Sequence, residues 1–221
     1  MRTLYHYPLS SSSRRVRVAL TEKGLEFEPV VELPWRRRED FLALNPSGDV
    51  PVLVEDDGFV ATGFAIAEYL EEAYPKPPLL PVAPKARAEV RRLVEWFEVK
   101  FEREVTENLV GEKVMKRVSG LGQPSGLAIR AGLANIHYHL DYIAFLAERR
   151  TWLGGESFSH ADIAAGVQLS AVDYCGLVPW DEHPDAKDWY ARIKSRPSFR
   201  PLLGDFVPGV PPPHHYADLD F

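Results

Sequence analysis

The fold of this chain is decided by the stretch Val52-Leu-Val-Glu-Asp-Asp-Gly-Phe-Val-Ala-Thr62, in which two apolar runs flank Asp56-Asp57-Gly58. A polar turn with glycine between two β-forming runs is typical of a hairpin. The apolar residues Ile66, Tyr69 and Leu70 follow at helical spacing, and Thr62 is placed to cap the helix that they predict. The stretch therefore predicts a ββα unit.

The residues before this stretch predict a βαβ unit. Residues 4–7 and 27–31 have the composition of strands, and residues 13–23 have the pattern of an amphipathic helix that ends at Gly24. Residues 32–45 show no periodic pattern, and we expect them to be irregular. A βαβ unit followed by ββα is the thioredoxin-like arrangement, so residues 1–75 are predicted to form an α/β domain of that kind.

The rest of the chain divides into a linker, a helical region and a tail. Prolines at 75, 77, 78, 81 and 84 exclude a continuous helix or central strand, and we expect a linker at 76–84. Residues 85–203 predict an all-α domain with long helices at 85–118 and 125–150 and shorter ones at 160–174 and 184–195. Residues 204–221 form a proline-rich tail whose end mixes aromatic residues with carboxylates.

Composition narrows the class of protein. The 221 residues are 45% hydrophobic and 26% charged, as in soluble globular proteins. A net charge of −6 argues against sequence-independent nucleic-acid binding, which requires a basic surface. One cysteine, Cys175, cannot form an internal disulfide. Neither a signal peptide nor a membrane-spanning stretch is recognisable, so we expect a cytoplasmic protein without membrane insertion.

Four motifs follow one another along the chain. They are the serine-rich turn and helix start at 10–20, the sequence Asn45-Pro-Ser-Gly-Asp-Val-Pro-Val-Leu53, the helix cap Ser159-His-Ala-Asp162, and Trp189 with Ser195-Arg-Pro-Ser-Phe199. Taken together and in order, they resemble the glutathione transferase superfamily, and the resemblance extends to about Leu203. It implies a thioredoxin-like α/β N-terminal domain, an all-α C-terminal domain and a cis peptide bond before Pro51.

The same resemblance implies a glutathione site that is vestigial here. Ser10 stands in place of the family's catalytic hydroxyl, and Val50 with Pro51 would form the edge that pairs with a bound peptide. The family's Glu-Ser pair, which grips the γ-glutamyl group, is replaced by Thr62 and Gly63. Losing two charge-assisted hydrogen bonds costs about 3 to 6 kcal/mol, or on the order of 10² to 10⁴ in affinity. We therefore expect no bound cofactor and no catalytic residue.

Two segments are candidates for contact with a partner protein. The first is the basic run at 35–38, from which we select Trp35, Arg36 and Arg38, because the resemblance places this loop beside the glutathione site; a solvated charge run is the alternative. The second is the acidic and aromatic end of the chain, which is either a docking peptide or a strap packed on the domain. Its selected residues are Tyr216, Asp218, Leu219, Asp220 and Phe221.

Other residues that could carry chemistry have structural interpretations. His137 and His139 lie two apart and so on different faces of a helix, which makes them a poor metal pair, and we expect no metal site. Ser159 and Asp162 are spaced to form a reciprocal helix cap, worth about 1 kcal/mol.

Within the superfamily, residues 1–5, 185–197 and 215–221 resemble a cell-division branch from alphaproteobacteria whose members bind the tubulin homologue FtsZ. That resemblance implies a non-enzymatic homodimer that binds FtsZ polymers at the division site and promotes constriction. Other division proteins are further candidate partners. The alternative function is a serine-type glutathione transferase or isomerase that uses Ser10 on a small-molecule thiol adduct.

Overall fold

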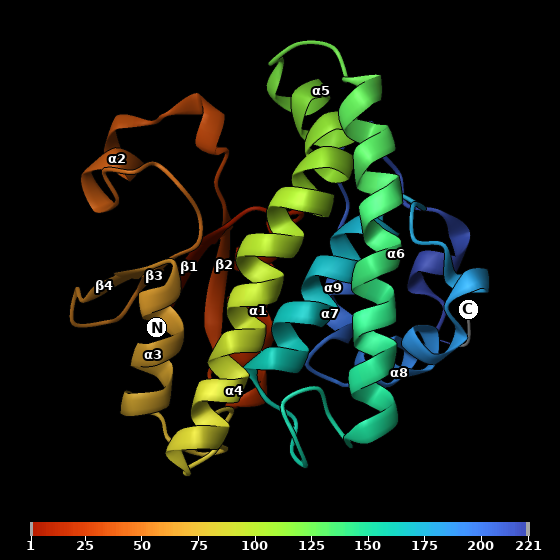
Figure 1. The fold of residues 1–221 in the computed structure, drawn as a ribbon. Coiled ribbons are helices and arrows are strands. Elements are labelled where there is room, and N and C mark those ends of the chain that lie inside the picture. The colour runs from red at the N-terminus through yellow and green to blue at the C-terminus, as the bar shows by residue number, and fades with distance from the viewer. Residues whose placement is uncertain (1, 220–221) are drawn as a thin grey trace. The chain divides into compact units, whose positions relative to one another are not determined.

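The computed structural model describes residues 2–219 (Figure 1). The chain divides into two compact units, the first ending at Leu79 and the second beginning at Leu80. The first unit contains a four-stranded sheet with helices, and the second is built from helices. The predicted fold class, a thioredoxin-like α/β domain followed by an all-α domain, is confirmed.

The sheet of the first unit has the strand order β2-β1-β3-β4. β1 pairs in parallel with β2 and antiparallel with β3, and β3 pairs antiparallel with β4. Leu4, Leu53 and Ala61 lie in register across three neighbouring strands, and all three side chains are buried. The strands are β1 (Arg2–His6), β2 (Phe27–Val31), β3 (Val52–Val54) and β4 (Val60–Thr62).

The predicted hairpin is present, but the following helix begins differently from our expectation. The turn joins β3 to β4 with Gly58 at φ +85°, a backbone conformation that glycine adopts without strain. Thr62 is the last residue of β4 rather than a cap. Gly63 is the N-cap of α3 (Phe64–Ala73), and no side chain caps this helix, whose buried face includes Ile66 and Leu70.

Residues 32–45 are more regular than the sequence predicts. They contain a 3-10 turn, η1 (Pro34–Arg36), and a short helix, α2 (Glu39–Leu44). A six-residue helix is too short to show a periodic pattern, and its N-cap, Arg38, makes no capping hydrogen bond. Burial of Phe41, whose ring lies 5.6 Å from that of Tyr5, ties α2 to the sheet. A tertiary contact therefore stabilises a helix that local sequence does not predict.

The second unit is built around a long helical hairpin. α4 (Pro84–Glu95) continues into the π-helical segment η2 (Trp96–Met115) and then α5 (Lys116–Ser119). α6 (Gly126–Arg149) runs alongside η2, as Figure 1 shows in green. A Cβ at Gly132 would lie 2.8 Å from Leu109, so glycine permits this close approach. The predicted long helices are present, but π-helix replaces α-helix from Trp96 to Met115.

The remaining elements pack around a central buried helix. All residues of α7 (His160–Asp173) are buried, and the predicted reciprocal cap of Ser159 and Asp162 is present at its start. The elements that follow are η3 (Trp180–Glu182), α8 (Pro184–Lys194), α9 (Arg200–Leu203) and η4 (His214–Ala217). Within residues 2–219, none of the helices has the length and apolarity needed to cross a membrane.

Candidate functional site

Ser10 has the position that a thiolate-stabilising hydroxyl requires. It is the N-cap of α1 (Ser11–Glu22), and its Oγ accepts a hydrogen bond from the Ser13 amide at 3.2 Å. The Ser10 and Ser12 hydroxyls lie 3.0 Å apart. The unpaired amides and dipole at a helix N-terminus favour an anion nearby. The turn could therefore hold a small anionic group, although its hydroxyls already hydrogen-bond to one another.

The peptide-pairing edge predicted at residues 50 and 51 has the expected backbone. The Val50–Pro51 bond is cis. The Ser12 hydroxyl donates to the Val50 carbonyl oxygen at 3.3 Å, and the Asn45 amide group donates to the Asp49 carbonyl at 2.8 Å. Because a carbonyl oxygen has two lone pairs, Val50 retains one acceptor position for an incoming chain. The edge is therefore partly satisfied from within the unit.

Thr62 and Gly63, which the resemblance compares with the family's γ-glutamyl grip, lie at the junction between β4 and α3. Thr62 pairs with Val52 in the sheet. Gly63 has φ +54° and ψ −129°, and its amide donates to the Pro51 carbonyl at 3.4 Å. A Cβ at this glycine would meet no atom within 4 Å, yet side chains rarely adopt its backbone conformation. The backbone at position 63 is therefore suited to glycine rather than to serine.

The basic loop, residues 35–38, presents two uncommitted guanidinium groups. The Trp35 ring packs edge-on against Tyr7 with centroids 5.1 Å apart, which leaves it half-buried. Arg36 and Arg37 are exposed, and neither forms an ion pair with any residue in the range 2–219. Arg37 has a left-handed backbone with φ +45°. The loop therefore offers positive charge beside an aromatic ring.

Arg38, which the sequence analysis selected, is engaged inside the unit. Its guanidinium lies 2.8 Å from the Glu32 carboxylate and 2.9 Å from Asp40. Hydrogen bonding to Glu32 raises the pKa of Arg38. Glu32 is buried, so Arg38 neutralises a charge that would otherwise be costly there. The sequence does not distinguish Arg37 from Arg36 and Arg38, because identical side chains in a run differ only in their tertiary neighbours.

The tail residues fall into three groups. Tyr216 is fully buried, which corrects the expectation that its side chain contacts a partner; for His214–Ala217 the strap alternative holds. Asp218 is exposed and Leu219 is partly exposed. Asp220 and Phe221 lie outside the described residues. Docking through Asp218 and the residues that follow it stays a prediction.

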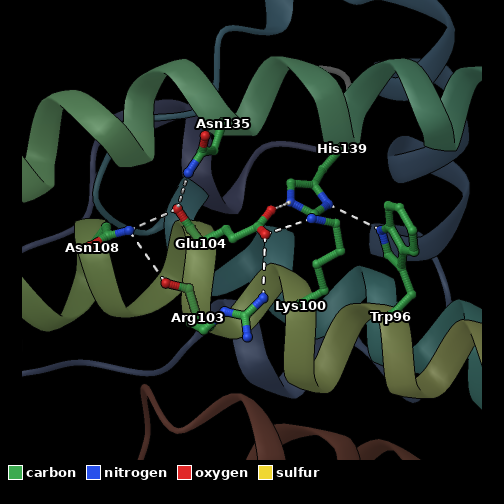
Figure 2. Close-up of polar contacts among 7 residues, drawn as sticks. All are labelled: Trp96, Lys100, Arg103, Glu104, Asn108, Asn135 and His139. Atoms are coloured by element: carbon green, nitrogen blue, oxygen red, sulfur yellow. Dashed lines mark hydrogen bonds and ion pairs between the residues drawn. The ribbon is translucent and has the colours of Figure 1, made fainter.

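A polar cluster between η2 and α6 was not singled out by the sequence (Figure 2). The His139 Nδ1 accepts a hydrogen bond from the Trp96 indole at 3.1 Å, and its Nε2 lies 3.2 Å from the Glu104 carboxylate. Lys100 also donates to that carboxylate. Burial lowers the pKa of His139 to about 4. A neutral, unexposed histidine with both nitrogens engaged holds the two helices together and cannot meet a substrate.

The two histidines of α6 diverge, as their spacing predicts. His137 is partly exposed, and its Nδ1 lies 2.9 Å from the Nε2 of His183, whereas His139 is buried in the cluster with Glu104. Across residues 2–219, no three histidine, cysteine or acidic side chains are arranged to hold a metal ion.

Comparison with known proteins places this chain in a family. The glutathione S-transferase N-terminal domain matches residues 4–78. FtsZ-localized protein A from Caulobacter vibrioides is 46% identical over 224 residues, covering 100% of this chain and 98% of that protein. The chain belongs to the glutathione S-transferase superfamily.

Solved structures agree over the whole length. FzlA from C. crescentus is 47% identical with a TM-score of 0.96, covering 100% of this chain and 99% of that chain. A crystal structure described as a glutathione S-transferase from Rhodospirillum rubrum F11 is 59% identical with a TM-score of 0.98, and each chain is covered completely. The likeness therefore includes both units and the strap.

Proposed function

We propose that this chain is a non-enzymatic, glutathione-transferase-like cell-division protein that binds FtsZ filaments and promotes constriction. The observation that carries the proposal is the 46% identity, over the complete chain, with a protein named for its localisation with FtsZ. The protein would act in the cytoplasm at the division site. A fluorescent fusion expressed in the native cell should concentrate there, and uniform fluorescence in dividing cells would contradict this localisation.

The state of the thiol site supports a role other than catalysis. A glutathione transferase must hold the tripeptide through its γ-glutamyl end, and Thr62 and Gly63 provide neither a carboxylate nor a second hydroxyl there. The Gly63 amide already donates to Pro51, so it is not a ready replacement for the missing grip. Binding of glutathione is therefore expected to be weaker than about 1 mM, in line with the loss of two charge-assisted hydrogen bonds.

The basic loop supports recognition of an acidic partner segment. Arg36 and Arg37 are exposed and unpaired among the described residues, and guanidinium groups bind carboxylates in bidentate geometry. Trp35 adds an apolar surface of the kind that dominates binding energy at protein interfaces. Asp218 and the residues after it would supply a second contact, of opposite charge. A homodimer would carry each surface twice and could bridge filaments through avidity.

Co-sedimentation with FtsZ polymers tests the proposal. The parent protein should pellet with polymers, and Arg36→Glu with Arg37→Glu should weaken binding about 100-fold or more, since each of the two lost charge-assisted contacts costs about 1.5 kcal/mol or more. Arg130→Glu, an exposed charge reversal on α6, serves as the matched control and should pellet like the parent. Failure of the parent to pellet would reject the function. Sedimentation equilibrium tests the homodimer separately, and the mass of a single chain would reject the dimer.

The second candidate function is a serine-type transferase or isomerase, and the N-cap position of Ser10 favours it. Glutathione calorimetry and a thiol-conjugation assay on the parent and on Ser10→Ala distinguish the two candidates. Submillimolar binding with turnover that disappears in Ser10→Ala would support the enzyme. Absence of turnover together with unchanged FtsZ binding in Ser10→Ala would support the adaptor.

A further inference from the structure

The strap is attached to α7 by two buried tyrosines. The Tyr174 hydroxyl accepts from the Val207 amide at 2.9 Å and donates to the Val210 carbonyl at 2.8 Å, which fixes the turn before the strap. The Tyr216 ring meets Tyr174 edge-on with centroids 5.2 Å apart. The strap is therefore held at its entry and at its centre.

The Tyr216 hydroxyl links three separate segments. It donates to the Leu202 carbonyl of α9 at 3.3 Å and lies 3.0 Å from the Ser170 hydroxyl of α7. The second contact joins two hydroxyls, each of which can donate or accept. A fully buried ring whose hydroxyl contacts two other segments is an anchor, and it would lose these contacts if the strap detached.

His215 makes polar contacts through both its imidazole ring and its backbone carbonyl. Its Nε2 lies 3.2 Å from the Asp173 carboxylate, which also receives the Trp180 indole hydrogen at 2.8 Å. Its carbonyl accepts from Lys194 at 3.3 Å and from the Asp218 amide at 3.1 Å. The carbonyl that Lys194 holds therefore also fixes the first residue beyond the strap.

The receiving surface is one face of α7. Ser170, Asp173 and Tyr174 are spaced i, i+3 and i+4, so their side chains lie together on one side of the helix end. Asp173 and Lys194 are fully buried, and burial raises the pKa of Asp173 and lowers that of Lys194. Charged groups in such positions require their few polar partners, and the strap supplies one to each.

We propose that His215 and Tyr216 latch the chain end onto α7, so that Asp173 and Tyr216 act as positioning residues for the docking segment that begins at Asp218. Only the biological purpose of the latch rests on the proposed function. The contacts that form the latch do not depend on that function. The latch holds Asp218 in one position, so binding of a partner does not have to order residues 214–218. Neither Asp173 nor Tyr216 touches the partner.

Hydrogen exchange on the full chain tests the latch without any partner. The amides of Tyr216 and Asp218 are donors in the strap, and they should exchange more slowly than in an unstructured peptide. Tyr216→Phe combined with Asp173→Asn should speed their exchange, whereas Tyr138→Phe, which alters an exposed tyrosine on α6, should not. Unprotected amides in the parent would overturn the latch.

Co-sedimentation with FtsZ polymers tests the positioning role. The double variant should bind about 10-fold more weakly, the cost of ordering one or two additional residues. Removing the residues after Ala217 should also weaken binding, and in that truncated chain the double variant should have no further effect. If the truncation and the double variant each weakened binding independently, so that their effects multiplied, the positioning role would be overturned. Truncation without effect would reject docking through the chain end, and the exchange result would still decide whether the latch exists.

Discussion

The basic loop at 35–38 and the strap at His214–Ala217 both combine an aromatic residue with charged or titratable ones. The structure uses them in opposite ways. In the loop, Arg36 and Arg37 are exposed while Arg38 neutralises the buried Glu32. In the strap, Tyr216 is buried and its hydroxyl bonds within the unit. Similar composition therefore leads to an accessible surface in one segment and an internal anchor in the other.

The largest effect is expected where the strap is anchored. Tyr216→Ala should lower the free energy of unfolding by about 3 to 5 kcal/mol, as for other large buried aromatic residues. Tyr216→Phe keeps the ring and should cost only about 1 kcal/mol. Urea denaturation followed by tryptophan fluorescence measures both. A loss of less than about 1 kcal/mol in Tyr216→Ala would contradict the interpretation of Tyr216 as an anchor.

Buried His139 extends the comparison to pH. Its pKa is about 4 in the folded protein, compared with an ordinary value of 6.5. Between pH 6.5 and 4 the unfolded chain therefore binds a proton at this histidine that the folded chain does not bind. Its stabilising contribution is complete above pH 6.5 and is lost as pH falls toward 4, by roughly 3 kcal/mol. His139→Gln should remove this dependence, measured as the stability difference from the parent.

That difference is the proper readout because Asp162 works in the opposite direction. Burial raises the pKa of Asp162 from 3.8 to about 6, so its contribution is greatest at low pH and declines as pH rises through 6. The two trends oppose each other in the parent. A parent-minus-variant difference for His139→Gln that stayed constant between pH 4 and 6.5 would contradict the assignment of a neutral, buried histidine.

Gly63 tests whether the junction between β4 and α3 is set by the backbone rather than by side chains. Gly63→Ala should destabilise the protein by about 1 to 2 kcal/mol, because φ +54° is strained for any side chain. Gly111→Ala is the matched control: its Cβ would lie 3.9 Å from the nearest atom, and it should be neutral or slightly stabilising. Equal effects of the two changes would contradict this interpretation.

The smallest effect on stability is expected in the basic loop. Arg36→Ala should change the free energy of unfolding by less than about 0.5 kcal/mol, since the side chain is exposed and pairs with no described residue. The same change should weaken FtsZ binding. A loss of about 1 kcal/mol in Arg36→Ala, as large as that expected for Tyr216→Phe, would show that the Arg36 side chain stabilises the fold. It would contradict the contrast between an exposed loop and a buried strap.

Much of the fold could be predicted because its signals are local. The hairpin turn at Asp56–Gly58, the periodic apolar residues of α6 and the cap of Ser159 with Asp162 act over a few residues. Helix α2 escaped prediction because burial of Phe41 stabilises it. The cluster of Glu104 with His139 escaped for a similar reason, since its members lie 35 positions apart.

The sequence by itself determined the order of the strands and of the long helices, and the superfamily, since periodicity, turn chemistry and residue identity are properties of short segments. Only the tertiary structure decided that Arg37 is available, that Arg38 is engaged and that Tyr216 is an anchor. The partners that bury Tyr216 come from α7 and α9, 46 and 14 residues away. Whether a polar or aromatic side chain is exposed depends on such distant partners, and they meet only when the chain folds.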